Sequence, residues 1–493
     1  MTTATQTELY RLTAHEIRDA LRAGRATAVE ITEAFLGRID AVDGKVQAYL
    51  DVWRDTALER AADVDARLAK GEELPPLAGV PVSLKDLLCT TEGTTSCCSR
   101  ILEGYRSPFN GTVVQRLYDA GAIPLGKVNM DEFAMGSSTE NSAVKKTYNP
   151  WDLSRVPGGS SGGSAASVAA DECAFSIGSD TGGSIREPAA FCGCVGLKPT
   201  YGRVSRYGLV AFASSLDQIG PLTKDVEDAA LVMNAIAGPD PRDSTTAQTP
   251  PPDYTAALRD DIKGLRIGLP KEYFEEALGK AMRSKIDQAI GVLESQGAEI
   301  VEVSLPHTQY AVATYYVICT AEASANLARF DGVRYGHRAE GVRDVASLYC
   351  DTKSAGFGPE VQRRIILGTY VLSSGYHDAY YLKAQKVRRL MQEDFLKAFE
   401  QCDVIAAPTT PTPAFPVGEK VTDPLEMYLN DIYTIPANLA GIPCMSAPCG
   451  LTDEKLPAGL ALMGRHFEEE TLIRAAYVYE QHAGLDMGRP RID

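Results

Sequence analysis

The chain has 493 residues, 49 of them basic and 65 acidic, so its formal net charge is −16. Charged residues make up 23% and hydrophobic residues 44%, which is typical of a globular protein and excludes a disordered or fibrous chain. The acidic balance argues against an autonomous nucleic-acid binder, because phosphate binding depends on basic side chains that release counterions. No apolar run approaches the ~18 residues of a membrane span. The opening residues also lack the regions of a secretory signal, so we expect a cytoplasmic protein.

The cysteines and histidines do not suggest a metal site. The eleven cysteines are odd in number and several stand in apolar runs, which favours reduced core thiols. The closest groups are Cys97–Cys98 and the pair Cys192 and Cys194, and neither has the spacing of a zinc ribbon. The six histidines are scattered and form no HExxH motif. We therefore predict no metal ligands, and the role of these four cysteines stays open.

The first predicted elements are two helices, each with a recognisable start. Thr13 with Glu16, and Thr27 with Glu30, match the capping box, in which hydroxyl and carboxylate satisfy the free amides of the first turn. Gly24 stands where the first of these helices should end.

Short apolar strands alternate with helical stretches over the rest of the chain. A helical stretch of about twenty-five residues separates the candidate strands 265–269 and 300–303, which is typical of a βαβ unit. The pattern predicts an α/β fold with a central mixed, largely parallel sheet covered by helices on both faces. The candidate strands are 80–84, 123–126, 265–269, 300–303 and 404–407.

One segment, 238–253 (GPDPRDSTTAQTPPPD), interrupts this alternation. Its proline and hydroxyl content is typical of an exposed connection. Composition does not decide whether it divides two domains or is a surface loop within one.

Glycine and serine are concentrated in residues 157–184, and several functions compete for this tract. A phosphate loop is disfavoured because GxxxxGK[ST] is absent. A nucleophile elbow at 158–162 would need a preceding strand, and the residues before it contain two prolines. An SxxK match, Ser142 to Lys145, lacks the companion motifs of penicillin-binding proteins. The remaining possibility is a serine nucleophile activated by Lys85, since burial after an apolar strand would lower the pKa of that amine.

Plain structural interpretations also exist for these residues. The glycines could simply form tight turns in a linker, and Lys85 could be a lysine that extends to solvent from a strand end. The tract is interleaved with apolar segments, however, so it is expected to be buried. Buried glycine-rich backbone usually marks a close approach to another group.

Three motifs resemble the amidase signature family: GVPVSLKD (79–86), PGGSSGGSAA (157–166) and GSDTGGSIREPAAFCGCVGLKPTYGRVS (178–205). Members of that family hydrolyse carboxamides with a Ser–cis-Ser–Lys triad on an α/β fold. The spacing agrees, with the lysine 75 residues before the first serine and that serine 24 residues before the second. The resemblance implies one amidase domain over 1–493, with a signature core at about 79–225, the connection at about 238–253, and 264–493 completing the sheet and substrate pocket.

The resemblance also implies the catalytic roles. Ser184 would be the acyl nucleophile, Ser160 the bridging serine after a cis peptide bond, and Lys85 the terminal base. The turn before the nucleophile would offer main-chain amides to a tetrahedral intermediate, and glycines suit it because no Cβ blocks the carbonyl. The residues of this oxyanion hole would be Thr181, Gly182 and Gly183.

Further segments are similar to a narrower family, the glutaminase (A) subunits of glutamyl-tRNA(Gln) amidotransferases: 129–142, 322–336, 358–388 and 423–443. That similarity implies release of ammonia from glutamine, for conversion of Glu-tRNA(Gln) to Gln-tRNA(Gln) by a partner. The implied partners are a B subunit that uses ATP and Mg and binds most of the tRNA, and a small C subunit. No cofactor is expected in this chain, and no membrane partner.

Matching positions imply that Tyr315, Arg364 and Asp431 bind the glutamine. Arg364 can pair with the α-carboxylate, Asp431 with the α-ammonium, and Tyr315 can hydrogen-bond from a pocket wall. Each also has a plain interpretation: the pair Arg363–Arg364 could be a solvated helix face, and Asp431 could cap a helix. Two other functions stay open, a stand-alone amidase with the same triad acting on another carboxamide and an assembly subunit that has lost activity.

Overall fold

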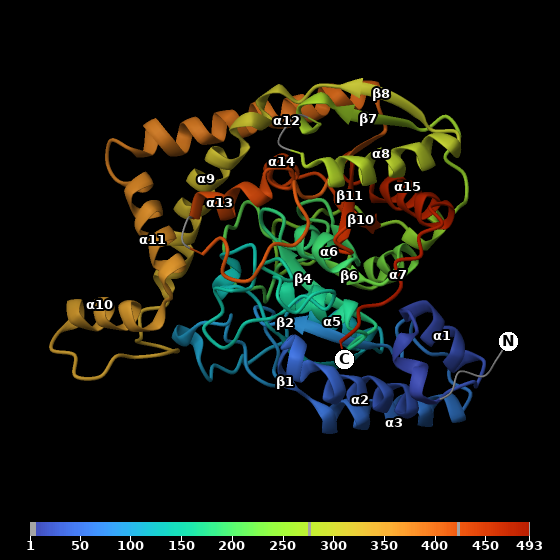
Figure 1. The fold of residues 1–493 in the computed structure, drawn as a ribbon. Helices are drawn as coiled ribbons and strands as arrows, with labels where there is room; N and C mark the ends of the chain where they lie inside the picture. Colours follow the sequence, from blue (N-terminus) through green and yellow to red (C-terminus); the bar gives the residue numbers. More distant parts are fainter. Residues whose placement is uncertain (1–5, 275–277, 422–423, 493) are drawn as a thin grey trace.

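The computed structural model describes residues 6–274, 278–421 and 424–492, so the first residue of the segment 423–443 lies outside it. Within these ranges, eleven strands form one sheet in the order β1-β3-β2-β4-β6-β5-β10-β11-β9-β7-β8 (Figure 1). The strands are β1 (Tyr49–Val52), β2 (Pro81–Lys85), β3 (Ile123–Val128), β4 (Phe175–Asp180), β5 (Val195–Lys198), β6 (Gln218–Thr223), β7 (Arg266–Pro270), β8 (Glu299–Val303), β9 (Val404–Pro408), β10 (Cys444–Leu451) and β11 (Pro457–Gly464).

Fifteen α-helices surround this sheet in the described ranges. None of them is both long and apolar enough to cross a lipid bilayer. They are α1 (Ala14–Arg22), α2 (Ala28–Val46), α3 (Arg54–Ala69), α4 (Thr112–Asp119), α5 (Gly162–Ala169), α6 (Arg186–Cys192), α7 (Val226–Ile236), α8 (Lys280–Ser295), α9 (Ala311–Asn326), α10 (Val345–Gly356), α11 (Pro359–Leu372), α12 (Lys383–Gln401), α13 (Pro424–Tyr428), α14 (Ile435–Ala440) and α15 (Glu469–His482).

Short helices of other types fill several connections. A π-helix, His377–Leu382, leads into α12. The 3-10 helices are Gln6–Arg11, Arg100–Leu102, Glu132–Ala134, Tyr254–Ala257, Lys271–Tyr273, Pro306–Tyr310, Leu327–Arg329 and Leu429–Asp431.

The starts of the first two helices confirm the prediction. Both capping boxes form, with Thr13 and Thr27 as the N-cap residues of α1 and α2. Helix α1 ends at Arg22, and Gly24 follows in the left-handed region with φ 63°. Glycine suits that position because a Cβ would crowd the backbone there.

The sheet is mixed, and the α/β class is confirmed. Parallel pairing is confined to two groups of three strands, β3-β2-β4 and β8-β7-β9. The predicted βαβ unit is β7-α8-β8. The other six pairings are antiparallel, so the sheet is less parallel than expected. The reason is that all five predicted strands lie in the parallel groups, whereas the strands that were not predicted, apart from β4, make only antiparallel pairings.

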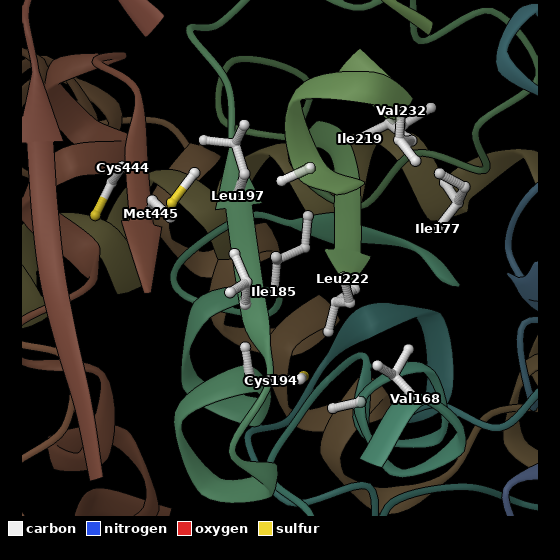
Figure 2. Packing of buried hydrophobic residues seen from close by; sticks show 14 of the residues in the cluster. Val168, Ile177, Ile185, Cys194, Leu197, Ile219, Leu222, Val232, Cys444 and Met445 are labelled. Atoms are coloured by element: carbon white, nitrogen blue, oxygen red, sulfur yellow. The ribbon is translucent and has the colours of Figure 1, made fainter. Parts of the chain in front are cut away.

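Helices pack on both faces of the sheet, as predicted. On strand β11 a Cβ at Gly459 would meet Ala190 of α6, and a Cβ at Gly464 would meet Leu472 of α15. These two glycines are an odd number of residues apart, so they face opposite sides of the sheet. Figure 2 shows the core around α6, where Ile185 packs near Leu197 and other buried apolar side chains.

The proline-rich segment 238–253 is a surface connection that is anchored at a few points. The Asp240 carboxylate is buried and accepts a hydrogen bond from Ser205 Oγ at 2.7 Å. The N–H of Ala247 donates to the carbonyl of Gly202 at 2.9 Å. Strands from before and after the segment belong to the same sheet.

All eleven cysteines lie in the described ranges as free thiols, ten of them buried and Cys350 exposed. The two clusters noted in the sequence contact polar groups of the core. The Cys98 thiol donates to Asn129 Oδ1 at 3.1 Å, and the Cys192 thiol donates to the carbonyl of Pro157 at 3.3 Å. Reduced core thiols therefore describe these cysteines.

Candidate active site

Lys85 lies at the carboxyl end of β2 and is completely buried. Its ammonium nitrogen Nζ donates to three serine hydroxyls, at 2.8 Å to Ser160, 2.8 Å to Ser161 and 3.0 Å to Ser179. Strand β2 pairs with β4, which carries Ser179, and Ser160 and Ser161 directly precede α5. The sheet and the start of one helix thus fix this amine against hydroxyl groups.

Burial changes the chemistry of this amine. It lowers the pKa of Lys85 from the usual 10.5 to about 7, although the nearby carboxylates of Asp131, Asp180 and Asp217 act in the opposite direction. Removal from water penalises the charged form of a lysine. Close to neutral pH, a large fraction of Lys85 is therefore an uncharged amine that can accept a proton.

Ser160 follows a cis peptide bond between Gly159 and itself. The N–H of Gly159 donates to Glu187 Oε2 at 3.3 Å, and the carbonyl of Ser160 accepts from the N–H of Asp131 at 3.3 Å. The cis bond that the family resemblance implied is therefore present, and it is held from two sides by buried carboxylic residues.

Ser184 lies between the turn after β4 and the start of α6. It is buried, with 8% of its surface exposed. Its carbonyl accepts a hydrogen bond from the N–H of Ser161 at 3.1 Å. Because the Ser161 hydroxyl also contacts Lys85, the structure brings together all three residues of the predicted triad.

A buried ion pair fixes the residues around Ser184. Arg186 contacts Asp180 through Nε at 2.9 Å and through Nη2 at 3.0 Å, and Nη2 also reaches Asn438 Oδ1 at 2.6 Å. Burial alone would raise the pKa of Asp180, but the charge of Arg186 and the hydrogen bonds lower it to about 2. The N–H of Gly183 donates to the same carboxylate at 2.9 Å, so in this structure that predicted oxyanion donor is directed toward Asp180.

The rest of the glycine turn is held from other elements. The Thr181 hydroxyl donates to Asp217 Oδ1 at 2.7 Å. The carbonyl of Gly182 accepts from Thr434 Oγ1, which precedes α14, at 2.6 Å. The φ angle of Gly183 is 145°, a conformation that favours glycine.

Of the three predicted substrate-binding residues, Tyr315 packs directly against this turn. The ring of Tyr315 is so close to Gly182 that a Cβ there would lie 2.7 Å from Tyr315 Cζ. Arg364 and Asp431 are also buried, and Asp431 accepts a hydrogen bond from Ser137 Oγ at 2.7 Å. Burial raises the pKa of Asp431 to about 7, against the effects of that hydrogen bond and of the charge of Arg364.

Contacts link these residues through their neighbours. The guanidinium carbon of Arg364 lies 5.1 Å from the ring centroid of Tyr316, which is itself 5.1 Å from that of Tyr315. The carbonyl of Asp431 accepts from the N–H of Thr434 at 3.1 Å, and the Thr434 hydroxyl holds the glycine turn.

Burial raises the pKa of the Tyr315 hydroxyl well above its usual value, and the charges of Arg364 and Asp431 act on it in opposite directions. A tyrosine, a guanidinium and a carboxylate therefore stand together beside the turn that precedes Ser184.

Several residues of the site were not found from the sequence. Ser161 and Ser179 contact Lys85, and Asp180 with Arg186 fixes the turn. The only signal for them was their position inside the glycine and serine motifs. The SxxK match is unrelated, because Lys145 pairs with Asp43 at 3.8 Å.

One group in the described ranges has the geometry to hold a metal ion, formed by His15, Asp225 and Asp228. The contacts of this group show that it joins the start of α1 to α7. The Asp228 carboxylate accepts from the N–H groups of Ala14 and His15 at the start of α1, and from His15 Nδ1 at 2.9 Å.

Comparison with known proteins agrees with this geometry. A family model described as Amidase matches residues 30–473. The A subunit of the glutamyl-tRNA(Gln) amidotransferase of Moorella thermoacetica is 59% identical over 98% of this chain and 99% of its own. The crystal structure of the corresponding A subunit from Thermotoga maritima is 41% identical with a TM-score of 0.79, covering 99% of this chain and 98% of that one.

A solved amidase of different activity is also similar. The peptide amidase of Stenotrophomonas maltophilia is 32% identical with a TM-score of 0.83, covering 99% of this chain and 100% of that one. The family model includes every residue of the site described above. The chain therefore belongs to the amidase family.

Proposed function

We propose that this amidase is the glutaminase subunit of a glutamyl-tRNA(Gln) amidotransferase. The observation that carries the chemistry is the completely buried Lys85 amine, 2.8 Å from Ser160 Oγ and with a pKa lowered to about 7 by burial. Nearly full-length identity of 56–59% to proteins of that name supports the substrate and the biological role. These similarities favour this function over a stand-alone amidase.

In the first half of the reaction, Ser184 Oγ attacks the γ-carboxamide carbon of glutamine. Its proton passes to Ser160 Oγ as the proton of Ser160 passes to the neutral Lys85 amine. The tetrahedral intermediate collapses as the C–N bond breaks, and the proton returns by the same route to the leaving nitrogen. Ammonia departs, and a γ-glutamyl ester remains on Ser184.

In the second half, water attacks the ester carbon and the same three groups handle its proton. Glutamate leaves and Ser184 regains its hydroxyl hydrogen, so the sum is glutamine plus water to glutamate plus ammonia. The N–H groups of Thr181, Gly182 and Gly183 would stabilise the oxyanion in both halves, with that of Gly183 shared with Asp180. Each such donor typically contributes ~3–4 kcal/mol to the transition state.

The three residues beside the turn would orient the substrate. Arg364 would bind the α-carboxylate, Asp431 the α-ammonium, and Tyr315 would form a wall with its hydroxyl available for a hydrogen bond. The charges are opposite to those of the amino-acid group, which suits recognition of a zwitterion.

The released ammonia would be used by a partner. Under this proposal a B subunit binds ATP, Mg and most of the tRNA and amidates the misacylated glutamate, and a small C subunit completes a cytoplasmic heterotrimer. This chain would need no cofactor of its own. Purification of the tagged chain from its native lysate tests this: two stoichiometric partners are expected, and recovery of the chain alone with full amidase activity would contradict it.

The chemistry is tested by the Ser184→Ala variant. Removal of the nucleophile should reduce ammonia release from glutamine by at least about a thousandfold. Lys85→Met should lose nearly as much, because members of a triad act as a unit. Circular dichroism should show both variants folded. A folded Ser184→Ala protein that retains substantial ammonia release would refute the acyl-enzyme.

A further inference from the structure

Helix α11 presents two consecutive arginines to one carboxylate. Glu360 stands in its first turn and is 10% exposed at the side chain. Arg364, one turn later, is 3% exposed, and its Nε donates to Glu360 Oε1 at 2.8 Å. Arg363 pairs with the other carboxylate oxygen from the solvent side and is 44% exposed. The same glutamate therefore joins a buried and an exposed guanidinium.

The buried guanidinium is fixed by more than this ion pair. Its carbon lies 5.1 Å from the ring centroid of Tyr316, 5.4 Å from that of Tyr428 and 5.5 Å from that of Phe212. The rings of Tyr316 and Tyr428 are themselves stacked at 3.8 Å. Aromatic faces attract a guanidinium and restrict its plane. The position of Arg364 is thus set by rings around it and by one carboxylate behind it.

Tyr428 completes the arrangement by contacting Glu360 directly. Its hydroxyl donates to Glu360 Oε1 at 2.8 Å, the same oxygen that accepts from Arg364. Burial raises the pKa of Glu360, but the charge of Arg364 and these hydrogen bonds outweigh it, so the pKa is lowered on balance. Glu360 is therefore an anion at neutral pH.

The contacts leave one side of Arg364 available. Among the described residues, its Nε has the carboxylate as partner, and its two terminal nitrogens have no protein hydrogen-bond partner. A guanidinium binds a carboxylate in a planar, two-bonded manner that depends strongly on its orientation. A carboxylate that binds Nε and leaves the two terminal nitrogens free would direct those nitrogens at a ligand.

We propose that Glu360 is a positioning residue that aims the terminal nitrogens of Arg364 at the substrate α-carboxylate, and so makes the enzyme selective for amides that carry this group. This inference rests on the proposed function, because it assumes that Arg364 binds the carboxylate of glutamine. In this proposal Glu360 acts only through Arg364 and contacts neither the substrate nor the reacting atoms. Its effect should therefore appear in substrate binding and not in the chemical step.

The test compares Glu360→Gln with Arg363→Gln in the protein purified with its native partners. Glu360→Gln keeps the shape but weakens the charged hydrogen bond, so the KM for glutamine should rise about tenfold while kcat changes less than about twofold. Arg363→Gln removes a cation from the same glutamate on the exposed side, and both constants should stay within about twofold. Tyr428→Phe removes one uncharged donor to Glu360 and should raise the KM about threefold.

Two glutamine analogues separate positioning from general damage. Glutaramic acid lacks the ammonium and keeps the carboxylate, and γ-aminobutyramide keeps the ammonium and lacks the carboxylate. In Glu360→Gln the inhibition constant of glutaramic acid against glutamine hydrolysis should rise about tenfold, and that of γ-aminobutyramide should not change. Equal changes for both analogues, or no change for either, would overturn the proposal. Circular dichroism checks that Glu360→Gln is folded before the comparison is made, and if it is not, the milder Tyr428→Phe takes its place in the same comparison.

Arg364→Gln distinguishes this inference from the proposed function beneath it. If Arg364→Gln raises the KM for glutamine and Glu360→Gln does not, only the positioning role of Glu360 fails. If Arg364→Gln leaves the KM for glutamine unchanged, the substrate assignment and the positioning role fail together.

Discussion

The pH dependence of ammonia release follows directly from the burial of Lys85. With a pKa of about 7, about half of the Lys85 amines are uncharged at pH 7, and about one in eleven at pH 6. If the neutral amine is the base, kcat/KM should rise about twofold between pH 7 and pH 8.5 and then level off. A lysine with the usual pKa of 10.5 would instead give a rise of about thirtyfold over that interval.

The interval from pH 7 to pH 8.5 is chosen because two of the carboxylates that act on Lys85 have already ionised below it. Burial raises the pKa values of Asp131 and Asp217 only to about 6, so both are already ionised. Asp431, whose burial raises its pKa to about 7, adds at most about another twofold. Initial rates of ammonia release at glutamine concentrations well below KM give the profile. A rise above about tenfold would refute the lowered pKa of Lys85.

Three substitutions test other parts of the site. Asp431→Asn should raise the KM for glutamine about tenfold without changing inhibition by glutaramic acid, and equal effects on both would contradict its contact with the ammonium. Gly182→Ala should reduce kcat/KM at least about tenfold, because the new Cβ would force the Tyr315 ring to move, and normal kinetics would contradict the close contact. Arg186→Met should lower the free energy of unfolding by about 3–5 kcal/mol in urea titrations, because Asp180 would stay buried without its partner; a loss below about 1 kcal/mol would count against the ion pair.

The sequence was most informative where strands are continuous apolar runs. The strands β2, β7 and β9 were predicted within a few residues because they are short, largely apolar and mostly buried. Strand β3 was predicted although it contains Pro124 and Gly126, and the partly exposed edge strand β8 was predicted from its short apolar run after a helical stretch. The strands β6 and β10 were missed because Pro221 stands inside the first, and Pro448 and Gly450 inside the second. Proline and glycine ordinarily indicate a turn, so only the pairing with neighbours shows these segments to be strands.

Within the site, side-chain direction was the information that the sequence lacked. The motifs placed Lys85 and the two serines of the proposed triad, but Ser160 and Ser161 are adjacent hydroxyls and both contact the amine. Likewise the pair Arg363–Arg364 was open to interpretation as a solvated face. One arginine is exposed and the other is buried, because consecutive residues on a helix point about 100° apart.

The hydrogen bonds of Arg186 connect the signature region, residues 79–225, to the C-terminal half of the chain. Residues 79–225 contain the proposed triad, but Arg186 also donates to the carbonyl of Thr434 and to Asn438 Oδ1, and β10 pairs with the outer edge of β5. If the signature region were transplanted alone, it would carry the reactive groups together with an unpaired strand edge and a partly unsatisfied buried cation. We therefore expect that the signature region does not fold as an independent unit without the C-terminal half.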